Sequence, residues 1–178
     1  MLAHRLPDLA SRIELFDAVS DGRRTAARRM LESGMSVNSS DLHGWTPLML
    51  AIAGGDMGFA RELVARHADV NARNSSGDTA LLLALRSQRS AEAAMLIASG
   101  ANVGISNEDG HTPLIAAAMH GDLAICRLLL ERGADRGHRD RRGMTALGYA
   151  EEEGQSEVVA LLRTSVPPSQ SVRHQITH

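Results

Sequence analysis

The sequence lacks lysine altogether and has few cysteine and aromatic residues. All 19 basic residues are arginine, one cysteine is present, and Phe, Trp and Tyr make up 2% of the 178 residues. One cysteine excludes an internal disulfide framework and a zinc site made of cysteines alone. The shortage of aromatic residues, beside 43% apolar residues, favours tightly stacked helices with small side chains over a sandwich or barrel.

Long apolar runs and a strong net charge are also missing. No stretch approaches the roughly 20 residues of a membrane helix, and the first 16 residues carry acidic side chains in place of the apolar core of a Sec-type signal peptide. The formal net charge is −2, so overall charge predicts no polyanionic partner. These absences favour a cytoplasmic protein, although an uncleaved secretion signal would leave no such mark.

The sequence is built on one pattern that returns every 33 residues. Four glycines mark this step: Gly44, Gly77, Gly110 and Gly143. A threonine two positions after each glycine, a leucine four positions after it and an alanine seven positions after it keep the same step. Four markers in phase, with no insertion between copies, predict a solenoid of stacked units.

Local chemistry predicts two helices in each unit. Thr46 and Thr112 are suited to cap a helix start, and the proline after each lacks only an N–H that the first turn does not need. Glycines that favour a left-handed backbone end the first helix, as at Gly121, and the second, as at Gly133. The second helix carries one apolar stripe, which predicts Cys126 as a core residue. A single unit cannot bury its stripe, so neighbouring units must stack.

The motifs G-x-T-P-L at 44–48 and 110–114, A-D-V-N at 68–71 and G-A-D at 133–135 resemble those of ankyrin repeats. The resemblance covers about 11–163. It implies an all-α solenoid of about five helix-turn-helix units joined by β-hairpin-like fingers, and a protein–protein interaction module with a concave groove. The histidine of the family's T-P-L-H motif is absent, and Met49, Leu82, Ile115 and Gly148 stand in its place.

The copies divide the chain into a lead-in at 1–10, a repeat domain at 11–163 and a flexible tail at 164–178. Within the domain, 11–40 is a degenerate N-terminal cap, and the later repeats span 41–73, 74–106, 107–139 and 140–163. The last of these is rich in glutamate, as a C-terminal cap exposed to water requires. His67 and Gln88 stand at two of the helix-ending glycine positions, which predicts backbone strain there.

The resemblance places a binding groove on the finger tips and the adjoining ends of the first helices. Residues that map there differ from copy to copy while the framework repeats, which is typical of a recognition surface on a regular scaffold. The predicted partner-binding set is Leu42, His43, Trp45, Ser76, Asp78, Arg86, Glu108, Asp109, His111, Met119, His120, Arg141, Arg142 and Met144. For Trp45 two interpretations stay open: an exposed interface anchor, or packing sideways on the neighbouring finger.

The sequence contains no catalytic constellation. The patterns H-E-x-x-H, G-x-S-x-G and the P-loop are all absent, so we expect neither an enzyme nor a cofactor. His43, His111 and His120 could share the groove, but their spacing matches no ligand motif. We therefore predict no metal site.

Three functions stay open from the sequence. The first is a cytoplasmic adaptor, scaffold or inhibitor, expected to be a monomer that binds one partner protein and no membrane. The second is a secreted effector acting on a host protein, since a chain without lysine offers no side chain to ubiquitin; a GC-rich genome explains the same absence. The third is polyanion or nucleic-acid binding through the arginine-rich finger at 132–142. Two observations count against it: no aromatic residues are interspersed among these arginines, and the net charge of the chain is negative.

Overall fold

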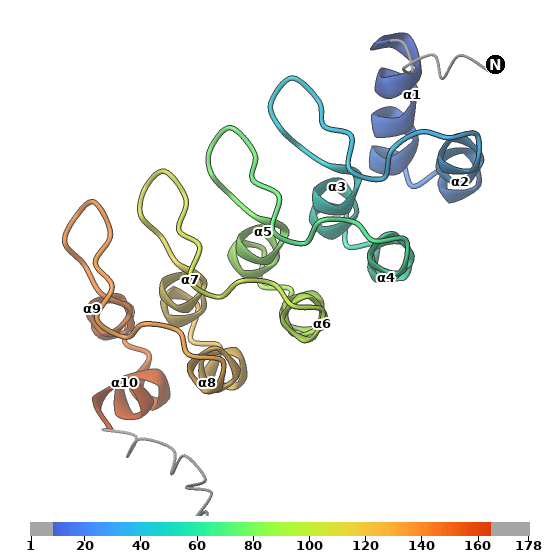
Figure 1. Cartoon of the computed structure of the whole chain (residues 1–178). Coiled ribbons are helices and arrows are strands. Elements are labelled where there is room, and N and C mark those ends of the chain that lie inside the picture. The colour runs from blue at the N-terminus through green and yellow to red at the C-terminus, as the bar shows by residue number, and fades with distance from the viewer. Residues whose placement is uncertain (1–8, 165–178) are drawn as a thin grey trace, which may run out of the picture.

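The computed structural model of the chain describes residues 9–164, and within that range the chain forms ten α-helices and no strands. The helices come in five consecutive pairs (Figure 1). Their bounds are α1 (Leu9–Ser20) and α2 (Arg24–Glu32), α3 (Pro47–Ala53) and α4 (Met57–Ala65), α5 (Ala80–Arg86) and α6 (Ser90–Ala98), α7 (Pro113–Met119) and α8 (Leu123–Glu131), and α9 (Ala146–Glu152) and α10 (Ser156–Arg163). The all-α solenoid predicted from the sequence is confirmed.

The molecule has three layers that run along its length (Figure 1). The first helices of the pairs form an inner row, the second helices form an outer row, and four loops stand on the side of the inner row away from the outer one. We call these loops fingers and define them by their central residues, 41–45, 74–78, 107–111 and 140–144. Their shape is that of a hairpin, but in the described residues they contain loop backbone and no strand.

The inner helices begin at the threonines that the sequence singled out. The hydroxyl of Thr46 accepts a hydrogen bond from the backbone N–H of Met49, and Thr79, Thr112 and Thr145 do the same, at 3.2–3.3 Å. Each bond satisfies a donor that the first helical turn leaves unpaired. All four caps therefore fix where a finger ends and an inner helix starts.

The helix ends also follow the sequence prediction. The glycines at the ends of both helix rows have positive φ, for example 71° at Gly121 and 86° at Gly133. The two non-glycine residues at such positions keep the same conformation, with φ of 63° at His67 and 54° at Gln88. They are the only non-glycine residues with positive φ in the described part of the chain.

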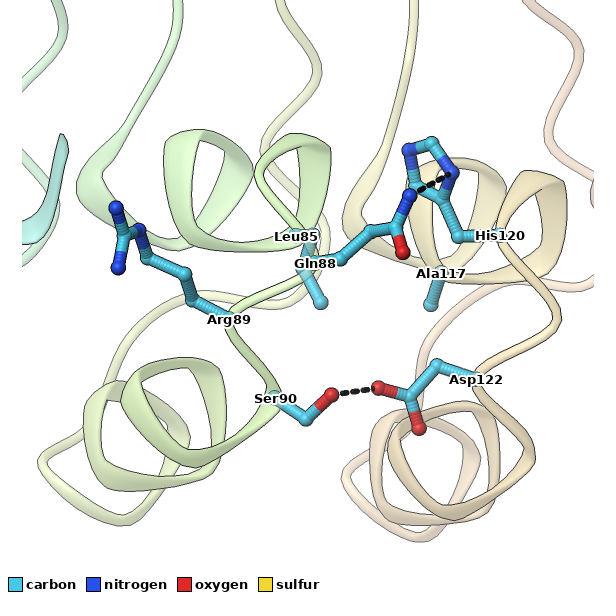
Figure 2. A pocket seen from close by; sticks show the side chains of 7 residues that line it. All are labelled: Leu85, Gln88, Arg89, Ser90, Ala117, His120 and Asp122. Carbon is cyan, nitrogen blue, oxygen red and sulfur yellow. Dashed lines mark hydrogen bonds between the residues drawn. The ribbon is translucent and has the colours of Figure 1, made fainter. Parts of the chain in front are cut away.

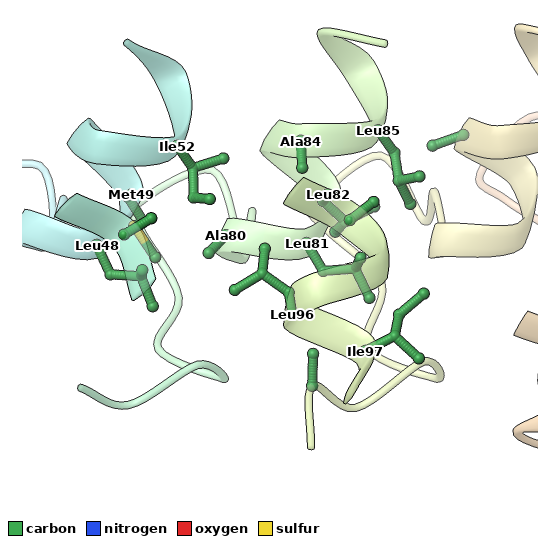
Figure 3. Packing of buried hydrophobic residues seen from close by; sticks show 14 of the residues in the cluster. Leu48, Met49, Ile52, Ala80, Leu81, Leu82, Ala84, Leu85, Leu96 and Ile97 are labelled. Atoms are coloured by element: carbon green, nitrogen blue, oxygen red, sulfur yellow. The ribbon is translucent and has the colours of Figure 1, made fainter. Parts of the chain in front are cut away.

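The core runs continuously between the inner and outer rows. Figure 3 shows Met49 and Ile52 of α3 facing α5, with Leu96 of α6 beneath the inner row. Cys126 is fully buried in α8, and burial, with a smaller contribution from Asp122, raises the pKa of its thiol to about 12. Cys126 is therefore a core residue, as predicted, and not a nucleophile.

The first pair differs from the others. Helix α1 has 12 residues, against 7 in each later inner helix, and it starts two residues before the predicted repeat boundary at 11. Residues 1–8 of the predicted lead-in and 165–178 of the predicted tail lie outside the described residues.

Candidate functional site

Each finger is held by the side chain of its first residue. The Oδ1 atom of Asp41 accepts hydrogen bonds from the backbone N–H groups of His43 and Trp45, both at 2.8 Å. Asn74, Asn107 and Asp140 make the same pair of bonds in their fingers, at 2.8–3.1 Å. A backbone bond from Asp41 N–H to the Trp45 carbonyl closes the loop at 3.0 Å, and the other fingers repeat it. We call this arrangement the Asx clamp; the sequence reading missed it, although Asp or Asn recurs there every 33 residues.

Neighbouring fingers are joined edge to edge. One N–H near each tip donates to a carbonyl of the preceding finger: Ser75 to His43 at 2.8 Å, Glu108 to Ser76 at 2.9 Å and Arg141 to Asp109 at 3.0 Å. The four fingers therefore form a row with a fixed spacing, and side chains of different repeats stand in register along it.

The finger tips carry most of the exposed members of the predicted set. Leu42 is 90% exposed, and His43, Ser76, Glu108, Asp109, Arg141 and Arg142 are also exposed. At the exposed tips, an ion pair crosses from Arg141 to Glu108 of the preceding finger at 3.1 Å. We call the surface of these tips and the adjoining ends of the inner helices the groove surface.

Asp78 belongs to the scaffold under this surface. It is 3% exposed, and its carboxylate accepts hydrogen bonds from Arg86 at 2.7 Å and from the amide of Asn107 at 2.9 Å. The first bond holds the half-exposed Arg86 side chain at the end of α5. Asp78 thus positions Arg86 and links two fingers, while its own atoms are covered.

Three apolar members of the predicted set are half-buried. Trp45, Met119 and Met144 all pack against the core while keeping part of their surface in solvent. For Trp45, the contact with the core beneath the finger row is one that neither interpretation named, and the exposed part of its side chain remains available to a partner.

A cavity of about 220 Å³ lies between the third and fourth repeats (Figure 2). Leu85 and Ala117 lie between two polar pairs that bridge the repeats. The amide of Gln88 lies 3.4 Å from the Nδ1 atom of His120, and the hydroxyl of Ser90 donates to Asp122. His120 is exposed at the mouth of this cavity, so the groove surface continues into it.

A buried polar cluster supports the last finger. The hydroxyl of Tyr149 donates to Asp140 at 2.6 Å, and the Nε2 atom of His111 lies 3.3 Å from the same carboxylate oxygen. The Arg142 guanidinium lies 5.8 Å from the centre of the Tyr149 ring. The sequence reading missed Tyr149, because its partners come from two other segments and no local pattern marks them.

The pKa values of this cluster follow from its contacts. Burial alone would raise the pKa of Asp140, but hydrogen bonds from Tyr149 and from the backbone of Met144 and Arg142, with the charge of His111, together lower it. Burial and the same carboxylate raise the pKa of Tyr149. The cluster therefore favours an ionised Asp140 beside a neutral Tyr149.

Comparison with protein families agrees with the geometry. A family model described as ankyrin repeats (3 copies) matches residues 15–107 and 90–170. The chain belongs to the ankyrin-repeat family. Ankyrin repeats are generally protein–protein interaction modules and are typically not enzymes. A search of curated proteins finds no match to the chain.

The arginine-rich segment of this ankyrin solenoid does not gather its charges in one place. Arg132 donates to the Ile97 carbonyl at 3.0 Å, and Arg136 donates to the Thr164 carbonyl at the end of α10 at 2.5 Å. Arg139 donates to the Gly143 carbonyl within its own finger at 2.8 Å. Arg141 and Arg142 are exposed at the tip, on the groove surface of the ankyrin repeats.

Between residues 9 and 164, no three His, Cys, Asp or Glu side chains lie close enough together to hold a metal ion. None of the described helices has the length and apolar character needed to span a bilayer.

Proposed function

We propose that this ankyrin-repeat protein binds one partner protein through its groove surface, as a monomeric adaptor, scaffold or inhibitor in the cytoplasm. The observation that carries the proposal is the contrast between constant backbone and varied side chains in the fingers. The same clamp recurs in every finger and the same backbone bond recurs at each of the three junctions between fingers, yet the second residue of the finger is Leu42, Ser75, Glu108 or Arg141. A fixed row of unlike side chains suits recognition of one particular surface.

The charge of the row also supports a protein partner. The acidic residues Glu108 and Asp109 lie on one finger and the basic residues Arg141 and Arg142 lie on the next, so groups of opposite charge meet in the row. A protein surface of mixed charge complements such a pattern better than a polyanion does. The bonds of Arg132, Arg136 and Arg139 to carbonyl groups weaken the nucleic-acid alternative further.

The test is capture from the native lysate by two matched variants. The groove variant carries Glu108→Ser, Arg141→Ser and Arg142→Ser. The control variant carries Glu131→Ser, Arg61→Ser and Arg127→Ser, which are also exposed but lie on the outer helices. Circular dichroism first establishes that all three proteins are folded.

We expect wild type and the control variant to capture the same protein and the groove variant to lose it, as quantified by mass spectrometry. Loss from both variants, or from the control alone, would place the binding face elsewhere. If no protein were captured, the effector alternative would be favoured. The absence of lysine and the 164–178 segment support that alternative. A secretion assay with and without that segment tests the alternative directly.

A further inference from the structure

Helix α1 replaces a finger. One 33-residue step before Leu42 and Trp45 lie Leu9 and Arg12, and both belong to α1. Residues 9–12, which are equivalent to 42–45 of the next finger, are therefore helical in the first repeat, and α1 rises beside the 41–45 finger (Figure 1). A helix uses its backbone N–H and C=O groups internally. The 41–45 finger therefore has no finger before it to bond with.

This leaves a backbone donor unused at the start of the finger row. Ser75, Glu108 and Arg141 each donate their N–H to the preceding finger. Leu42 is the equivalent residue in the first finger, and its N–H has no partner among the described residues. An open edge of this kind is a template for another extended segment.

An apolar groove runs along this open edge. Its volume is about 280 Å³, and its apolar walls are Ile13 and Phe16 from α1 and Leu42 from the finger. Ile13 is 53% exposed and Leu42 is 90% exposed, and they are the only large apolar side chains in the described chain with such exposure. Both border the same groove, so the greatest exposed apolar surface coincides with the free backbone donor.

The rim of this groove is acidic. Asp17 and Asp41 line it, and neither carboxylate has an ion-pair partner in the described residues. Arg12 lies in the same lining, but its guanidinium donates to the Ser40 carbonyl at the base of the finger. Two carboxylates and one engaged guanidinium leave a net negative rim.

We propose that this groove, the edge groove, binds an extended peptide segment of a partner protein with an aliphatic residue and, two positions later, a basic residue. The aliphatic side chain lies between Ile13, Phe16 and Leu42, and a peptide carbonyl accepts the Leu42 N–H. Residues two apart in an extended chain point to the same face, which brings the basic side chain to Asp17 and Asp41. The backbone bond supplies affinity and the side chains supply selectivity, as in other strand additions. This site lies at the end of the finger row and overlaps the groove surface proposed above only at Leu42 and His43.

The probe is a pooled library of capped pentapeptides with leucine second, arginine fourth and mixed residues elsewhere. It is titrated into the full chain labelled with ¹⁵N, and amide shifts are followed by NMR. A second library carries glutamate in place of arginine. We expect saturable shifts at Leu42, Ile13 and Asp17 with the arginine library and at least several-fold weaker binding of the glutamate library.

Two variants separate this site from the groove surface. Ile13→Ser with Leu42→Ser changes only exposed side chains, so the fold is kept, and we expect it to abolish the shifts at Asp17. Arg141→Ser with Arg142→Ser alters the groove surface, and we expect it to leave peptide binding unchanged.

Three outcomes would overturn the inference. Shifts confined to residues 108–109 and 141–142 would place the peptide on the groove surface. Equal binding of the two libraries would refute the assigned chemistry of the peptide. Shifts at Leu42 that grow with protein concentration and without peptide, together with a rising mass in ultracentrifugation, would mean that a second copy of the chain covers the edge. None of these results depends on whether the lysate experiment succeeds.

Discussion

His67 holds a left-handed backbone at the end of α4, where a glycine stands in the equivalent place after α2, α6 and α8. Its φ is 63°, and the side chain is exposed. A Cβ atom in this conformation is strained by roughly 1–2 kcal/mol. His67 and Gln88 are thus the two described positions where the repeat departs from glycine at a left-handed helix end.

We expect His67→Gly to stabilise the fold by about 1 kcal/mol, because glycine adopts this conformation without strain. For a chain of this length, that gain corresponds to a rise of roughly 2–4 °C in the melting temperature. Thermal unfolding followed by circular dichroism measures it. His67→Ala keeps the Cβ atom and is the control, which should gain nothing; an unchanged or lower melting temperature for the glycine variant would refute the account.

Asp140 makes stability depend on pH at the acidic end. The pKa of Asp140 is lower in the folded protein than in the unfolded chain. Its contribution to the free energy of unfolding is therefore fully present above the unfolded pKa of about 3.9, and it is lost as the pH falls through the folded pKa. We expect Asp140→Asn to lower the free energy of unfolding near neutral pH, and the gap to wild type to narrow below about pH 4. Asparagine already performs the clamp at 74 and 107, so the finger should still form. Urea unfolding across pH 2.5–7 provides the measurement, and a gap that stays constant would contradict it.

At the scale of the element, the fingers depend on close approach of their backbones. A Cβ atom on Gly110 would lie 2.9 Å from the Asp140 Cα atom of the next finger, whereas one on Gly143 would meet nothing within 4 Å. The two glycines have nearly the same φ, 82° and 77°. In the described residues, another finger follows Gly110 and none follows Gly143.

We therefore expect Gly110→Ala to destabilise the protein more than Gly143→Ala. Both substitutions incur the strain of a left-handed alanine, about 1–2 kcal/mol, but only the first pushes a neighbouring finger away. Chemical denaturation of both variants and wild type measures the difference. If both variants lost the same free energy of unfolding, the next finger could move away from a Cβ atom at position 110 without destabilising the fold.

The helices could largely be predicted from the sequence. The buried contacts that hold the finger residues in place could not. Thr112 caps α7 and Gly121 ends the turn after it through contacts within a few residues, and such local chemistry is visible in a repeated pattern. The burial of Asp78 was missed because it depends on Arg86 and Asn107, one of them in another repeat. Tyr149 was missed for the same reason. Contacts between repeats depend on how neighbouring repeats stack. The 33-residue period indicates that they stack but does not give the distances between particular side chains.

At the scale of the whole molecule, stability comes from stacking each pair on its neighbours. Inner helix α7 lies between α5 and α9, while α9 has a neighbouring inner helix on one side only (Figure 1). Both are seven-residue helices with a threonine cap, which makes them a matched pair. Terminal units of such a solenoid open more readily than internal ones.

We expect the backbone amides of α7 to exchange with deuterium more slowly than those of α9. Hydrogen exchange followed by mass spectrometry resolves the two helices. Equal protection of α7 and α9 would show that the described domain opens only as one unit.

The repeated clamp also bears on how such a gene can change. Every unit from one Asp or Asn clamp to the next is 33 residues long and meets its neighbours through the same backbone bond. Duplication or loss of one whole unit, cut between any two equivalent positions, would leave each junction chemically intact. The open edge beside α1 and the glutamate-rich end at α9 would stay at the termini. The gene can therefore gain or lose whole repeats while the fold is kept. The finger-tip residues of each added repeat are then free to evolve.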